Sequence, residues 1–128
     1  MSFEIILDGK KLLWTTKYEI EDSFEPDTVT THSGSIVIPP ETGTYTVSIE
    51  RATKVDYVDE GEIFSILEKC KTEPITCVAV KKTSNGSVRW THINCIRSSF
   101  KTSVDENGEI EFTFELTAED QKIETFNN

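Results

Sequence analysis

Hydrophobic and polar residues alternate most regularly over residues 96–119, in two runs separated by a short polar stretch. Each run has the two-residue period of a β-strand with one apolar and one polar face. A three-residue loop, Glu106-Asn107-Gly108, with Gly108 at positive φ, would pair Val104 with Ile110. A two-residue Asn107-Gly108 turn would set apolar residues opposite polar ones, so burial favours the first register. The segment therefore predicts an amphipathic β-hairpin whose apolar face carries Phe100, Val104, Ile110, Phe112, Phe114 and Leu116.

Turn residues divide much of the remaining chain into short strands. Asp8-Gly9 separates two runs, Phe3–Leu7 and Lys11–Tyr18, and is a strong hairpin signal. Residues Thr44–Arg51 alternate Tyr, Val and Ile with Thr, Ser and Glu, as a half-buried strand does. Asn85-Gly86 is expected to join two more arms. Further strands are therefore expected at Ser35–Pro39, Pro74–Lys82 and Ser87–Ile96.

One helix and one long loop are expected between these strands. Asp59 and Glu62 have the spacing of a capping box, which predicts a helix at about 60–71. Residues 19–34 are acidic and have little apolar periodicity, so we expect a long loop that is either mobile or docked on a partner. The chain after Leu116 loses its period and is expected to be an exposed end anchored by Phe126.

The order of elements, strands then one helix then strands, predicts the fold class. We expect a single mainly β domain over residues 1–128, an antiparallel β-sandwich or open barrel. The helix would flank the sheet, because a single short helix needs a packing surface to persist.

Charge and hydropathy exclude two classes of partner. The chain has 13 basic and 23 acidic residues, a formal charge of −10, which opposes direct binding to phosphate backbones. No apolar run approaches the roughly 18 residues that a membrane span needs. The first residues also lack the basic start of a signal peptide, so we expect a soluble protein made in the cytosol.

The three cysteines, Cys70, Cys77 and Cys95, leave two interpretations open. Their number and spacing do not fit a zinc site or a secreted disulfide framework. We favour reduced thiols that pack as small hydrophobes, and the alternative is an intermolecular disulfide formed after assembly. An Asn85-Gly86 turn would place Cys77 opposite Asn94, which points the sulfurs of Cys77 and Cys95 to opposite faces.

No constellation of residues predicts catalysis, a metal or a cofactor. The two histidines, His32 and His92, are not at metal-ligand spacing from each other or from a cysteine. The expected register puts His92 opposite Ala79 as a packed residue. Phosphate loops, nucleophile elbows and helical His pairs are missing, so we expect a protein that is not an enzyme.

The order of elements, the length of the chain and three passages together can be compared with known protein families. The passages are Gly34–Ile38 leading to Thr44–Arg51, Glu62–Leu67, and Arg97–Lys101 with Glu111–Glu115. This pattern resembles the tail tube proteins of bacteriophages and related contractile injection systems. The resemblance spans roughly residues 34–119 and carries over no catalytic residue.

The resemblance implies a β-sandwich protomer that forms hexameric rings, which stack into a hollow tube lined by β-sheet. In such a tube the polar face of the hairpin would meet the lumen, and an acidic lining would let DNA pass without binding it. The candidate lumen-facing residues are Lys101, Ser103, Glu109, Glu111, Thr113 and Glu115. The candidate inter-subunit loop residues are Glu19, Glu21, Asp22, Phe24, Glu25 and Asp27.

The same resemblance implies the partners and the location. The chain would bind copies of itself and, in the tail, sheath, tape-measure, baseplate and tail terminator proteins, after assembly in the host cytoplasm. Within this class a type VI secretion-like tube or a baseplate component remains open. The alternative from another class is a monomeric cytosolic binding or adaptor module.

Overall fold

The computed structural model describes residues 2–23, 27–31, 34–38 and 43–127. In these residues the chain forms ten β-strands and one α-helix. The strands before the helix are β1 (Phe3–Leu7), β2 (Lys10–Thr15), β3 (Lys17–Ser23), β4 (Asp27–Thr31), β5 (Gly34–Ile38) and β6 (Thr44–Lys54). The helix and the later strands are α1 (Glu60–Lys69), β7 (Ile75–Thr83), β8 (Gly86–Val104), β9 (Ile110–Ala118) and β10 (Asp120–Asn127).

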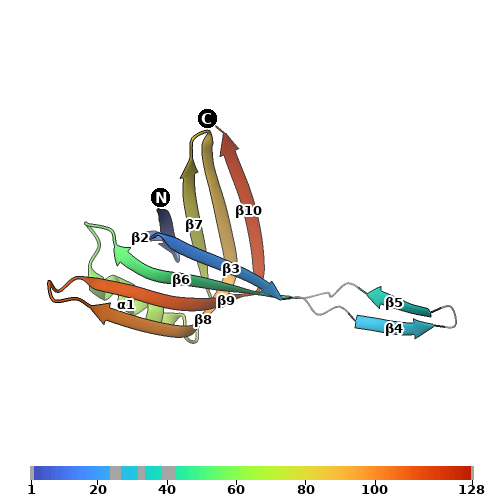
Figure 1. The fold of residues 1–128 in the computed structure, drawn as a ribbon. Helices are drawn as coiled ribbons and strands as arrows, with labels where there is room; N and C mark the ends of the chain where they lie inside the picture. Colours follow the sequence, from blue (N-terminus) through green and yellow to red (C-terminus); the bar gives the residue numbers. More distant parts are fainter. Residues whose placement is uncertain (1, 24–26, 32–33, 39–42, 128) are drawn as a thin grey trace.

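Six strands close into an antiparallel barrel in the order β1-β2-β6-β9-β8-β7, because β9 pairs with both β6 and β8. The 19-residue strand β8 makes this closure possible: its first half pairs with β7 and β10, and its second half pairs with β9. Strand β3 extends the sheet beyond β6. Figure 1 shows β7, β8 and β10 rising from the barrel and the β4–β5 hairpin extending away from it. The prediction of a mainly β fold with one helix is confirmed, and the predicted sandwich or open barrel is a closed barrel.

The β8–β9 hairpin has the predicted register. Val104 pairs with Ile110, and Gly108 has φ +80° at the end of the three-residue loop. The Asp105 side chain accepts hydrogen bonds from the amides of Asn107 and Glu109, both at 2.9 Å, which fixes the loop. The turn at Asp8-Gly9 is also confirmed, since both residues have positive φ between β1 and β2.

The core fills the barrel, and α1 packs against one part of it. The buried residues of β9 are Phe112, Phe114, Leu116 and Ala118, and those of α1 are Ile63, Ile66 and Leu67. Asp59 caps the helix by accepting a hydrogen bond from the Gly61 amide at 3.1 Å. The helix ends at Lys69, two residues before the predicted end. The Phe64 ring lies edge-on against Phe112 with 5.2 Å between centroids.

The predicted acidic loop over residues 19–34 is wrong in its described parts. Residues 17–23 form β3, which pairs with β6 over its whole length, and β4 pairs with β5 as a separate hairpin. In β3 the apolar residues Tyr18 and Ile20 alternate with acidic ones, a two-residue period that the overall acidity concealed.

Two expectations about the last third of the chain also need correction. Thr83 pairs with Gly86, so the β7–β8 loop is Ser84-Asn85 and the register differs by two residues from the predicted one. The tail after Leu116 is mostly strand, because β10 pairs with the first half of β8. The predicted anchor Phe126 remains 42% exposed, with the Arg89 guanidinium 5.0 Å from its ring centroid.

Candidate functional site: a polar face on four strands

The outward face of β3, β6, β9 and the second half of β8 is polar along its length. One row across all four strands contains Glu19, Ser48, Glu115 and Ser99, which are neighbours in register. Because residues paired across antiparallel strands lie on the same face, these pairings define one continuous surface. We call it the polar wall, and its members are Lys17, Glu19, Glu21, Thr46, Ser48, Glu50, Arg51, Ser99, Lys101, Ser103, Glu111, Thr113, Glu115 and Thr117.

The opposite face of the same strands belongs to the core. Ile49 pairs with Tyr18 on one side and Phe114 on the other, and both Ile49 and Phe114 are buried. The alternation along each strand therefore separates a wet face from a dry one. A rigid sheet with such a face can line a solvent channel or meet a polar partner.

Arg51 and Glu111 form the shortest ion pair among the described residues of the polar wall. The Arg51 Nε lies 2.9 Å from Glu111 Oε2, and Arg51 Nη2 lies 3.5 Å from Glu111 Oε1. Arg51 has φ +53° at a bulge in β6, and its amide donates to Thr113 Oγ1 at 3.1 Å. The hydrogen bond to Glu111 raises the pKa of Arg51 above its ordinary value.

Lys17 forms a second charge cluster at the β3 side of the wall. Its Nζ lies 3.3 Å from a carboxylate oxygen of Glu19 and 3.3 Å from one of Glu50. Hydrogen bonds to Glu19 and Glu50 raise the pKa of Lys17, so the ammonium stays charged. One cation thus serves two carboxylates.

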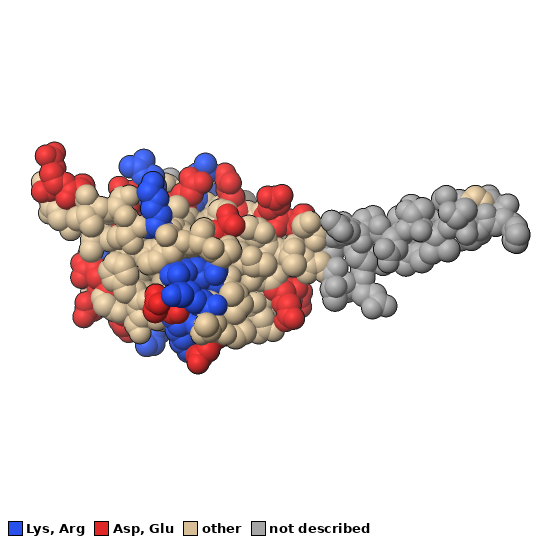
Figure 2. Space-filling model, turned by 90° about the horizontal axis from the view of Figure 1, so that it is seen from below, with Lys and Arg blue, Asp and Glu red and all other residues tan. Residues whose placement is uncertain are grey.

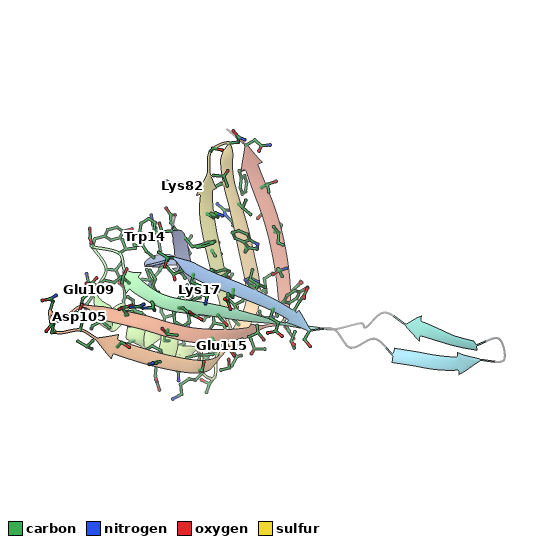
Figure 3. All side chains as sticks on the ribbon, viewed as in Figure 1. Trp14, Lys17, Lys82, Asp105, Glu109 and Glu115 are labelled. Carbon is green, nitrogen blue, oxygen red and sulfur yellow. The ribbon has the colours of Figure 1, made fainter. Side chains whose placement is uncertain are left out.

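Glu115 is held by hydroxyl groups. Ser48 Oγ donates to one of its carboxylate oxygens at 3.4 Å and Ser98 Oγ to the other at 3.3 Å. The wall carries five glutamates against three basic side chains, so it is acidic by two charges. Figure 3 places Glu115 on β9 and Lys17 on β3, on the same part of the barrel. A shallow depression crosses the wall, lined by Glu50, Arg51, Lys101, Ser103, Glu111 and Thr113.

Five of the six residues predicted to face a lumen lie together on the polar wall: Lys101, Ser103, Glu111, Thr113 and Glu115. Glu109 lies outside it, at the end of the β8–β9 hairpin, where Figure 3 shows it near Asp105. Lys17, Ser48, Glu50 and Arg51 were not predicted as members. The period-two patterns of Lys17–Ser23 and Thr44–Arg51 are the signal that could have found them.

The predicted inter-subunit loop residues fall on different elements. Glu19, Glu21 and Asp22 lie in β3, and Asp27 is the first residue of β4. Phe24 and Glu25 lie outside the described residues. A role in subunit contacts stays a prediction for all six.

All three cysteines are buried free thiols with 0% exposure. Cys70 Sγ donates to Leu67 O at 3.4 Å and Cys95 Sγ donates to His92 O at 3.3 Å. Burial raises the pKa of Cys95 to about 12 and that of Cys77 further, which keeps both thiols neutral and unreactive. A disulfide between copies needs a sulfur at the surface, so this burial favours the predicted reduced, packed thiols over the alternative of an intermolecular cross-link.

His92 is the centre of a buried hydrogen-bond network. Tyr18 Oη lies 3.0 Å from His92 Nδ1, and Gln121 Oε1 lies 2.7 Å from His92 Nε2. Since the glutamine oxygen only accepts, Nε2 carries the proton and Nδ1 accepts from the tyrosine hydroxyl. Burial lowers the pKa of His92 and raises that of Tyr18. His92 pairs with Cys77 instead of Ala79, and its network ties β3 and β10 to β8.

The described part of the chain lacks two further features. It holds no cluster of His, Cys, Asp and Glu side chains arranged to bind a metal ion. It also contains no helix of the length and hydropathy required to cross a membrane.

Comparison with known proteins identifies the fold. No family model and no curated protein matches the sequence. Among solved structures, a chain of the PVC sheath–tube complex, an extracellular contractile injection system in its extended state, is 11% identical with a TM-score of 0.64. The anti-feeding prophage cap, which terminates the AFP tube, is 15% identical with a TM-score of 0.65. In both cases 97% of this chain and 88% of the other chain are covered.

A third structure, Hcp1 from Flavobacterium johnsoniae, is 16% identical with a TM-score of 0.53 and is covered completely, as is this chain. The chain has the tail-tube fold. The polar wall is thus one face of a tail-tube barrel, and α1 packs on the opposite, apolar side of the β8–β9 hairpin.

Proposed function

We propose that this chain is the structural subunit of a tail tube, forming hexameric rings that stack into a hollow tube through which DNA passes. The tail-tube fold over the whole chain supports a structural role in a tube. The proposal of a ring with a lumen rests on the polar wall, because the wall is one face of an amphipathic four-stranded sheet that has an open edge on each side.

The two open edges suggest how a ring closes. Among the described residues, β3 pairs only with β6, and residues 96–104 of β8 pair with no strand except β9. At the start of this β8 edge the Arg97 amide donates to Cys70 O at 2.8 Å, so the edge is open beyond that point. The β3 edge carries three acids, Glu19, Glu21 and Asp22, and one base, Lys17. The β8 edge carries Arg97 and Lys101 and no acid. Figure 2, seen from the side where β8 and α1 lie, shows Lys and Arg gathered in a band with Asp and Glu around it. Pairing the acidic edge of one copy with the basic edge of the next would bury both edges in a heterologous ring.

The β4–β5 hairpin supports stacking of such rings. Within the described ranges its two strands pair only with each other, and an isolated two-stranded hairpin is marginally stable in water. It extends away from the barrel in Figure 1, on the side opposite to the end of the β8–β9 hairpin. We propose that it packs on a neighbouring subunit or ring, with the predicted residues of the 19–27 segment near that contact.

The lumen would be lined by the polar wall. An acidic excess repels phosphates, and serine, threonine and paired charges present a hydrated surface without a patch of unpaired cations. DNA would therefore slide past without being held. No catalytic step is part of this role.

The partners follow from the place in a tail. The chain would contact itself within and between rings, and sheath, tape-measure, baseplate and terminator proteins at the surface and ends of the tube. Two of the similar structures are described as parts of a contractile injection system and of a prophage tube cap. This favours, as the second candidate, the inner tube of an extracellular injection particle that carries no genome.

Negative-stain microscopy and sizing of the purified protein test the proposal. We expect hexameric rings or tubes whose proportion rises with protein concentration. A strict monomer at high concentration would favour the monomeric adaptor alternative instead.

Matched charge reversals locate the ring contact. Glu21→Arg puts a cation on the β3 edge opposite the basic β8 edge, so we expect a folded protein that has lost its rings. Glu124→Arg, on β10 away from the polar wall, should keep them. Equal assembly of both variants would contradict pairing between the β3 and β8 edges.

A further inference from the structure

The barrel has a second surface, on strands β10, β8, β7, β1 and β2, with a charge opposite to that of the whole chain. One row across it contains, in register, Glu124, Arg89, Val80, Glu4 and Trp14. The next row contains Lys122, Thr91, Val78, Ile6 and Lys11. We call these two rows, with Lys82 and Phe126 at their border, the outer face. In the closed barrel it lies across from the polar wall.

The outer face is basic although the protein is acidic. These two rows and their border carry four basic side chains, Lys11, Lys82, Arg89 and Lys122, and two acidic ones, a net charge of +2, whereas the whole chain carries −10. Asp120, in the next row of β10 opposite Ile93, adds one acid at the margin of this face. The two acids of the rows already have partners. Glu4 lies 3.3 Å from Lys11 Nζ, and Glu124 lies 3.8 Å from Lys122 Nζ.

Two cations of this face remain available for a partner. Neither Lys82 nor Arg89 has an ion pair with any acid in the described residues. Arg89 lies over the Phe126 ring at 5.0 Å from its centroid, which orients the guanidinium. Val80 separates the two in the sheet, since it is the register partner of Arg89 and lies two residues before Lys82.

Apolar side chains share the outer face with these cations. Ile6, Val78, Val80 and Trp14 are each partly exposed, and Lys11 Nζ lies 4.6 Å from the centroid of the Trp14 ring. A depression of about 260 Å³ next to Trp14 is lined also by Ser2, Glu4, Val80 and Lys82. Figure 3 shows Trp14 and Lys82 projecting from the same region of the barrel. The hollow is large enough for one apolar side chain. Its lining contains Lys82 and also Glu4, whose charge is offset by Lys11.

We infer that the outer face docks an acidic segment of another protein, with an aliphatic or aromatic side chain in the hollow beside Trp14 and carboxylates on Arg89 and Lys82. Aromatic and arginine side chains of this kind are the residues that contribute most binding energy at protein interfaces. Face-to-face pairing with a second copy would oppose Arg89 and Lys82 to their own equivalents, so like charge disfavours it. The inference goes beyond the proposed tube, because the face is complete in a single copy.

The test is a selection of random 12-residue peptides on the immobilised protein, followed by fluorescence anisotropy with the selected peptides. We expect acidic peptides with one or more apolar residues. Their dissociation constant should rise at least 10-fold in Arg89→Glu and in Trp14→Ala, and should also rise with salt. Lys71→Glu, a charge reversal just after α1 and outside both the outer face and the proposed ring edges, should bind as the wild type does.

Three outcomes overturn the inference. One is selected peptides without acidic residues, or with affinity unchanged in Arg89→Glu and Trp14→Ala. Another is a 20-base-pair DNA duplex that displaces the peptides and depends on the same residues, which would assign the face to nucleic acid. The third is loss of self-association in Arg89→Glu, which would assign it to contacts between copies. A monomer that binds the peptides would uphold this inference while contradicting the proposed tube.

Discussion

Single residues at unusual backbone angles shape the surface of this barrel. Arg51 and Asn94 have positive φ at bulges in β6 and β8, a conformation that costs energy for residues other than glycine. Each side chain contacts a distant carboxylate: Arg51 Nε donates to Glu111 at 2.9 Å, and Asn94 Nδ2 donates to Glu119 Oε2 at 2.7 Å. The bulges thus change the direction of the Arg51 and Asn94 side chains from the one that regular strands would give them.

His92 makes the stability of the fold depend on pH. Burial lowers its pKa in the folded state below the unfolded value of about 6.5, so the unfolded state binds more protons in acid. The contribution of neutral His92 to the free energy of unfolding is therefore complete above the unfolded pKa and is lost as the pH falls below it. The residues around the imidazole are Tyr18, Tyr45, Cys77, Cys95 and Gln121. None of them is a carboxylate that would stabilise the protonated imidazole. Urea unfolding should therefore show lower stability at pH 5.5 than at pH 7.5.

Two variants separate this effect from general acid unfolding. His92→Gln should lower the free energy of unfolding at pH 7.5 by about 1–3 kcal/mol, because it disturbs the buried hydrogen bonds. It should also make the free energy of unfolding change less between pH 5.5 and 7.5. His32→Gln removes the other histidine and should keep the wild-type slope. A His92→Gln profile parallel to wild type would mean that other groups cause the pH dependence.

At the scale of elements, the sequence was most informative where local chemistry decides the structure. Gly108, Asp8-Gly9 and the Asp59 cap each act within a few residues, and each was predicted correctly. The predicted β7–β8 register was wrong because pairing with a distant strand, β10, decides it. Asn85-Gly86 is a common turn pair, but here Gly86, at φ +154°, pairs with Asn127 of β10, and Ser84-Asn85 turns the chain.

Elements that depend on distant partners were missed. Strand β10 has weak alternation and exists because the first half of β8 offers it an edge. Strand β3 is acidic, and it is held by pairing with β6 and by the contact of Tyr18 with His92. Neither interaction is visible in a window of ten residues. The polar wall was likewise predicted only in its β8–β9 part, because β6 joins it through residues about 65 positions away.

The β8–β9 turn can be tested through Gly108. At φ +80° an added Cβ meets no atom within 4 Å, so Gly108→Ala changes only the backbone preference. We expect this variant to lower the free energy of unfolding by about 1 kcal/mol. Gly61 in the first turn of α1 is the matched control, since its φ is not in the left-handed region and Asp59 lies at an ordinary 3.6 Å.

Gly61→Ala should be neutral or stabilise the protein by about 0.5 kcal/mol, because alanine reduces the freedom of the unfolded chain. Urea unfolding of both variants measures the contrast. Equal changes in the free energy of unfolding would mean that the positive φ of Gly108 does not contribute to the stability of the β8–β9 hairpin.

At the scale of the whole molecule, barrel closure separates two charged surfaces. The polar wall is acidic by two charges, and the outer face across the barrel is basic by the same number. In a ring with the wall inside, DNA would meet only the acidic surface. Binding partners of the tube would meet the basic one.

Charge reversal of the polar wall tests this arrangement in assembled tubes. Glu111 and Glu115 lie on β9, in the middle of the wall, and contact Arg51 and two serines. Replacing both by lysine changes the charge by four per subunit, and a ring repeats that change at each copy. Wild-type tubes should sediment without double-stranded DNA. Glu111→Lys/Glu115→Lys tubes should retain DNA at low salt and release it as salt rises, since phosphate contacts exchange with counterions.

The position of the new charge distinguishes lumen from exterior. Glu60→Lys/Glu68→Lys makes the same charge change on α1, on the other side of the β8–β9 hairpin from the wall. DNA on those tubes should remain accessible to a nuclease, whereas DNA inside Glu111→Lys/Glu115→Lys tubes should be protected. If the wall variant fails to assemble while its fold stays intact, Glu111 and Glu115 lie at a subunit interface. Nuclease-sensitive DNA on both kinds of tube would place the polar wall outside, and the lumen would then need another lining.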